Sequence, residues 1–96
     1  MFVKGLPTTI ANVEDAKQLV RASGSIGANY IEANECIGKK DFVMKIKTCR
    51  REAKESAYWL RLFDCSDSLE QQRSELANEA LELMKIFGAI VRKSDH

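Results

Sequence analysis

The sequence of 96 residues contains one histidine, one proline and no long hydrophobic run. The histidine, His96, is the last residue, so neither a helical Glu-x-x-His metal site nor a Ser–His–Asp triad has a well-placed imidazole. No stretch approaches the roughly 18 apolar residues that a membrane span requires. We therefore expect no enzyme activity, no metal or cofactor, no small-molecule substrate and no membrane insertion.

Cysteine is scarce as well, and its spacing is uninformative for metal binding. Cys36, Cys49 and Cys65 lie 13 and 16 residues apart, and the odd number without a CxxC motif argues against a disulfide framework or a zinc site. The first residues, "MFVKGLPTT", lack an apolar signal core. Reduced thiols in a cytoplasmic protein are the expectation. The net charge of +1 means that any nucleic-acid binding must come from a local patch.

Apolar residues recur at steps of three and four in three segments, which is the helical period. The spacing predicts helices over residues 12–37, 39–64 and 68–92, joined by short connections. The fold expected is all-α, an antiparallel up-down helical bundle forming one domain over residues 1–96. Residues 1–11 are interpreted as the remnant of a preceding helix and its link. The clearest stripe is a seven-residue repeat in the second helix: Phe42, Ile46, Cys49, Ala53, Ser56, Leu60 and Phe63.

Local signals suggest where each helix begins or ends. Asn12, with Asp15 three residues on, is predicted to cap the first helix, and Gly38 is predicted to stop it. In "DSLEQ", either Asp67 or Ser68 is predicted to start the third helix through a capping box.

The segment "SGSIGANYIEANE" carries weak helix formers inside a helical pattern. Because Gly27 and Ala28 lack bulk, we expect another helix backbone to approach closely there, beside Ser23. Asn29 and Glu32 follow, and buried polar groups of this kind need partners. The favoured interpretation is that they fix helix register, and the alternative is that they bind a ligand. Four cations are candidate partners for Glu32: Arg21, Lys40, Arg50 and Arg51.

Glu52 and Glu55 lie three residues apart, so they share one helix face. Such pairs can serve acid–base chemistry or metals, but without a helical histidine we favour ion pairs with neighbouring cations and packing against Trp59.

A basic run occupies residues 39–54, with seven positive and two negative side chains. It predicts either a solvated face balanced by the acidic third helix or a site for nucleic-acid phosphates. The residues assigned to that site are Lys39, Lys40, Lys47, Arg50, Arg51 and Lys54.

Four pieces of the chain, "GLPTTIAN", "RASGSIGANYIEA", "GKKDFVMKI" and "EAKESAYWLRLF", occur in an order and spacing that resemble the four-helix-bundle proteins of the 23S rRNA intervening-sequence family. The resemblance implies a small pentameric bundle, without an established activity. The chain departs from the family in lacking most of the first long helix and in having Gly38 where Ser or Thr is common.

Three functions are therefore open. The first is a non-enzymatic bundle that self-associates, as a homo-oligomeric ring, because three amphipathic helices alone cover their apolar surface poorly. The second is a nucleic-acid-binding accessory module, an RNA-binding role similar to that of the accessory subunits of diversity-generating retroelements. The third is a scaffold or antitoxin-like partner that offers a helix surface to another protein.

Overall fold

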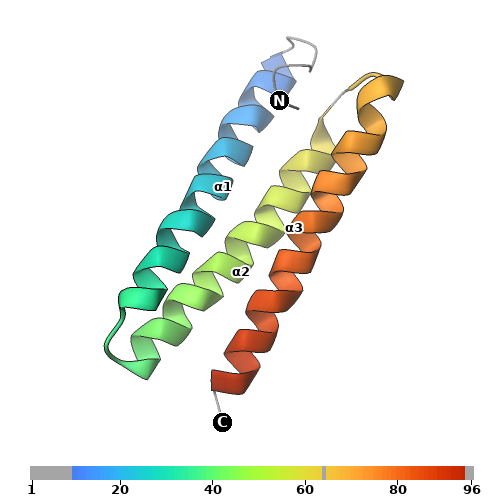
Figure 1. Cartoon of the computed structure of the whole chain (residues 1–96). Coiled ribbons are helices and arrows are strands. Elements are labelled where there is room, and N and C mark those ends of the chain that lie inside the picture. The colour runs from blue at the N-terminus through green and yellow to red at the C-terminus, as the bar shows by residue number, and fades with distance from the viewer. Residues whose placement is uncertain (1–9, 64, 95–96) are drawn as a thin grey trace.

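The computed structural model describes residues 10–63 and 65–94, which fold into three helices and no strand (Figure 1). Helix α1 spans Ile10–Glu35, α2 spans Lys39–Leu62 and α3 spans Asp67–Ser94. Each bound lies within two residues of the predicted one. The all-α fold is therefore confirmed.

The three helices lie side by side in an elongated body of 45 × 19 × 17 Å. Figure 1 shows that the chain reverses direction at each connection, so that α2 runs antiparallel to both of its neighbours. Helix α2 packs along α1 on one side and along α3 on the other, whereas α1 and α3 scarcely touch each other. The central position of α2 explains its wide apolar face, since a helix with two neighbours must bury both flanks.

The core follows the seven-residue repeat of α2. Ile46, Cys49 and Ala53 are completely buried, and with Ala33 of α1 and Phe87 of α3 they form one apolar cluster. A second cluster near the other end of the bundle contains these buried side chains: Leu19, Leu60, Phe63 and Ala77. The predicted stripe of α2 is therefore the central seam of the molecule.

The helix ends correct two predictions. Helix α1 already includes Ile10, so Asn12 is a buried helical residue rather than the cap that begins it. Gly38 does not end α1, which stops at Glu35. Gly38 instead precedes α2 with extended backbone, φ −93° and ψ 143°, and offers no side-chain cap. A missing side chain thus leaves this helix start without the bond that Ser or Thr would supply.

Arg73 of α3 reaches back to the end of α2. Helix α3 begins at Asp67, and Glu70 forms an ion pair with Arg73. Arg73 also donates a hydrogen bond of 2.9 Å from Nη1 to the carbonyl oxygen of Phe63, directly after α2. The guanidinium thus provides a hydrogen-bond donor to a carbonyl group at the C-terminal end of α2, where helix carbonyl groups have no partner within the helix.

The expected remnant of an earlier helix falls mostly on residues 1–9, which lie outside the described residues, while residues 10 and 11 belong to α1. In the described part of the chain, none of the helices combines the length and apolarity needed to cross a membrane.

Candidate functional site

An apolar groove runs between α1 and α3, whose backbones stay apart although some of their side chains meet, as the rings of Tyr30 and Phe87 do at a centroid distance of 6.2 Å. Its volume is about 300 Å³. Helix α2 forms its floor through Ser56 and Leu60, which are both buried. The walls come from α1 and α3, through Leu19, Ser23, Ile26, Leu76, Glu79, Ala80 and Leu83.

Exposed apolar side chains also occur on both of the helices that form the walls. On α1, Val20 is 64 % exposed and lies three residues before Ser23. On α3, Leu83 and Ile86 are 40 % and 53 % exposed. Each exposed aliphatic side chain is unremarkable alone, but several of them on the two helices that form an apolar groove favour an interaction surface.

The small residues of α1 do not make the close helix crossing that was predicted. A Cβ atom built on Gly24 or Gly27 meets no other group within 4 Å, and Ala28 is exposed. Ser23 lines the groove, and Gly27 follows it by one helical turn. In the described residues, the low bulk around Gly27 therefore faces open space beside the groove.

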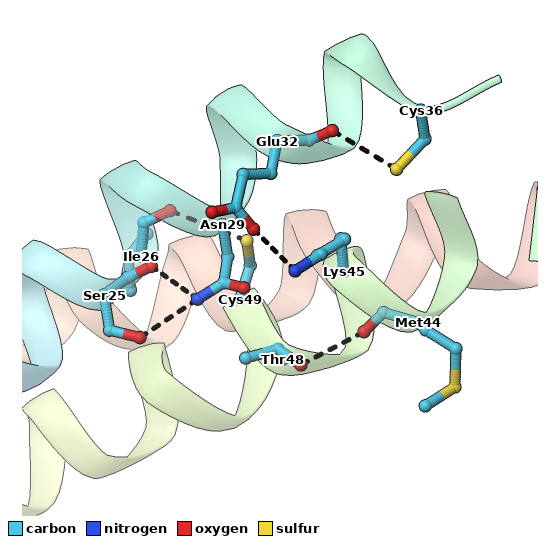
Figure 2. Close-up of polar contacts among 9 residues, drawn as sticks. All are labelled: Ser25, Ile26, Asn29, Glu32, Cys36, Met44, Lys45, Thr48 and Cys49. Atoms are coloured by element: carbon cyan, nitrogen blue, oxygen red, sulfur yellow. Dashed lines mark hydrogen bonds and ion pairs between the residues drawn. The ribbon is translucent and has the colours of Figure 1, made fainter. Parts of the chain in front are cut away.

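Asn29 and Glu32 are both placed differently from the prediction (Figure 2). Asn29 Nδ2 donates to the carbonyl oxygen and hydroxyl of Ser25, at 2.8 and 3.0 Å, so its contacts stay within α1. Glu32 is exposed and pairs with Lys45 of α2 at 2.5 Å, rather than with any of the four predicted cations. Glu32 does link two helices, but at the surface.

The inner contact between α1 and α2 is made by a thiol. Cys49 is completely buried, and its Sγ lies 3.6 Å from the carbonyl oxygen of Ile26, as Figure 2 shows. Burial raises the pKa of the Cys49 thiol, because desolvation penalises the thiolate. A buried, protonated thiol is a weak nucleophile, so Cys49 is a packing residue.

Glu52 and Glu55 are both partly buried on α2. Glu52 is half-buried and its Oε1 atom is 3.5 Å from Arg51 Nη2, in agreement with the predicted local ion pair. Glu55 lines a shallow cleft together with Trp59 and Arg21. Trp59 packs against the cluster around Leu60, and its ring meets that of Tyr58 edge to face at 5.1 Å. Among the described residues, no three metal-ligating side chains gather in one place.

The six basic residues of the predicted nucleic-acid site divide between two clefts. Lys39, Lys40 and Lys47 line one cleft with Val43 and Met44. The next cleft has a volume of about 340 Å³ and is lined by Lys47, Arg50, Arg51 and Lys54. Its remaining lining residue is Met84 of α3. No acidic residue lines either cleft.

The acidic residues of α3 do not neutralise this basic surface. Between described residues, the ion pairs lie within single helices, except for the pair that joins Lys45 to Glu32. Glu82 pairs with Lys85 on its own helix, and Glu79 lines the apolar groove. The α2 cations and the α3 carboxylates therefore occupy different faces.

The sequence did not predict the positions of three residues that contribute to these surfaces. Lys45 was counted in the basic run, but its pairing with Glu32 depends on how α1 and α2 align. Ile86 lies outside the predicted stripe of α3 and is exposed, three residues after Leu83 of the groove. Arg92, near the end of α3, lies beside Arg50 of α2, and no local spacing reveals that contact.

A family model described as 23S rRNA-intervening sequence protein matches residues 2–89. That range covers nearly the whole chain, including the residues that line the apolar groove and the two basic clefts. No curated protein and no solved structure matches the chain significantly.

Proposed function

The chain belongs to the 23S rRNA-intervening sequence protein family, and for this member we propose a non-enzymatic helical bundle that self-associates through the groove between α1 and α3. The observation that carries the proposal is an apolar groove with exposed aliphatic side chains on both of the helices that form its walls.

The occupant we propose is a helix of a second copy of the chain. A helix laid along the groove would cover Val20 on one wall and Leu83 and Ile86 on the other, removing apolar surface from water at roughly 25 cal/mol per Å². The small residues beside the groove favour this occupant, since Ser23 and Gly27 allow a helix backbone to come close. The acidic rim at Glu79 and the exposed cations of α2 are complementary in charge, which favours head-to-tail contact between copies.

Head-to-tail contacts use two different surfaces, so they close into a ring when the rotation between copies permits it. The homo-oligomeric ring, a pentamer by family resemblance, is the assembly that we propose. Such a ring would repeat every surface of the chain around one axis.

The test is a charge placed in the groove. Leu83→Glu combined with Ile86→Glu should convert the assembly to single chains in sedimentation velocity, while helicity by circular dichroism stays unchanged. The matched control is Ile37→Glu, which changes a fully exposed isoleucine between α1 and α2 and should leave the assembly intact. An assembly that survives both groove charges would refute the proposal.

Nucleic-acid binding by α2 is the second candidate function. It is favoured by one specific observation, namely that Lys47, Arg50 and Lys54 have no ion pair with a described residue in a cleft without acidic lining. Binding to a single-stranded oligonucleotide should weaken steeply as salt rises. Lys47→Glu with Arg51→Glu should abolish it, and unchanged binding by that variant would exclude this surface.

A further inference from the structure

Two guanidinium groups from different helices converge on Gly88. A Cβ atom built on Gly88 of α3 would lie 3.5 Å from Arg50 Nε of α2 and 3.4 Å from Arg92 Nη1 of α3. Gly88 is buried although both arginines are exposed, because these side chains lie over it. These distances are ordinary van der Waals contacts, so alanine would fit here, whereas a longer side chain would need the space that the two guanidiniums occupy.

Neither arginine has an acidic partner among the described residues. Two like charges held close together repel each other, and water reduces the repulsion only in part. The cleft lined by Lys47, Arg50, Arg51 and Lys54 adds Lys47 and Lys54, which have no ion pair with a described residue, and Arg51, whose charge is offset by Glu52. The seam between α2 and α3 therefore concentrates positive charge from two helices at one place.

Guanidinium groups match the oxygens of phosphate in both charge and geometry, and two of them can hold one phosphate from two sides. We propose that the seam at Gly88 binds the phosphodiester backbone of a nucleic acid, with Arg50 and Arg92 on one phosphate and the Lys47, Arg51 and Lys54 side chains on its neighbours. The proposal rests on the second candidate function and assigns it to a specific place.

The chemistry of the seam predicts binding without sequence preference. Met84 is the apolar residue in the cleft, and the lining contains no aromatic ring on which a base could stack. Contacts to phosphates position a nucleic acid without reading its sequence. Lys39 and Lys40 line the other cleft, so they serve as charge-matched controls.

The experiment measures fluorescence anisotropy of a labelled 20-nucleotide oligouridine with the full chain, across a series of salt concentrations. Arg50→Gln with Arg92→Gln should weaken binding about tenfold and reduce the slope of log K against log salt by roughly 0.7, as expected for one lost phosphate contact on a single strand. Lys39→Gln with Lys40→Gln removes the same charge from the other cleft and should change affinity by less than about threefold.

A third variant distinguishes binding that depends on the shape of the seam from binding that depends on net charge alone. Gly88→Leu keeps the net charge but fills the space under the two guanidiniums, so it should weaken binding while circular dichroism still reports a helical protein. If Gly88→Leu fails to fold, the double arginine variant and its control decide the matter alone.

Different results would contradict the seam at Gly88 and nucleic-acid binding by α2. Equal losses from the Arg50/Arg92 and Lys39/Lys40 variants would overturn the seam and leave nucleic-acid binding by α2 in place. No binding by the unaltered chain, even at low salt, would overturn both.

Discussion

Ser23 of α1 and Leu83 of α3 line one groove from opposite walls, above the buried floor of α2. Helices that are far apart in the sequence thus share a surface although they scarcely touch. The contribution of this groove to the stability of the chain and to its assembly can be measured.

The first prediction compares a wall residue with a floor residue. Leu60→Ala should lower the free energy of unfolding by about 2–5 kcal/mol, because Leu60 is buried and its loss leaves a cavity. Leu83→Ala should lower it by under about 1 kcal/mol in the single chain, since Leu83 is 40 % exposed. Urea unfolding at two protein concentrations is the measurement. If copies associate through the groove, the Leu83 effect grows with concentration and the Leu60 effect does not.

The second prediction concerns Gly27. Gly27→Ala should stabilise the single chain by roughly 0.5–1 kcal/mol, because alanine is the better helix former and its Cβ meets nothing within 4 Å. Gly27→Leu should preserve the helix but weaken association, since its bulk would hold a second helix away. Thermal unfolding and sedimentation velocity report the two effects. Unaltered association in the Gly27→Leu protein would show that the small residues of α1 are not needed for a second helix to bind.

The third prediction concerns thiol reactivity. Cys36 and Cys65 are partly exposed, whereas Cys49 is completely buried and burial raises the pKa of its thiol. Ellman's reagent at neutral pH should therefore modify two thiols rapidly and the third only as fast as the protein opens. Full modification in guanidinium chloride provides the control. Rapid reaction of Cys49 in the folded chain would show that the packing of α1 on α2 is wrong.

The fourth prediction concerns alkaline pH. The hydrogen bond and charge of Glu32 raise the pKa of Lys45 above its ordinary 10.5. The folded chain holds this proton more tightly than the unfolded chain, so the stabilisation is complete below pH 10.5 and is lost as the pH rises through the folded-state pKa. Urea midpoints of the unaltered protein and of Glu32→Gln should converge in that range. A difference that persists at higher pH would contradict the ion pair.

The helices were predictable because their apolar residues repeat with the helical period. Ile46, Cys49 and Ala53 fall on the central seam for the same reason. The ends were less predictable, because a cap depends on which residue adopts extended backbone. Gly38 illustrates this: it begins a helix where the pattern suggested that it would end one.

The surfaces were only partly predictable, because they depend on how the helices pack. The basic residues of α2 could be found by spacing, since one helix carries them all. The pairing of Lys45 with Glu32 and the approach of Arg92 to Arg50 arise between helices. The exposure of Gly27 follows from an arrangement in which α2, and not α1, occupies the centre of the bundle.

The most direct test of self-association is the mass of the unaltered protein by sedimentation equilibrium, from about 1 to 100 µM. The account predicts a discrete multiple of the 10.8 kDa chain, with a pentamer as the proposed number of copies. A mass of one chain throughout that range would contradict it.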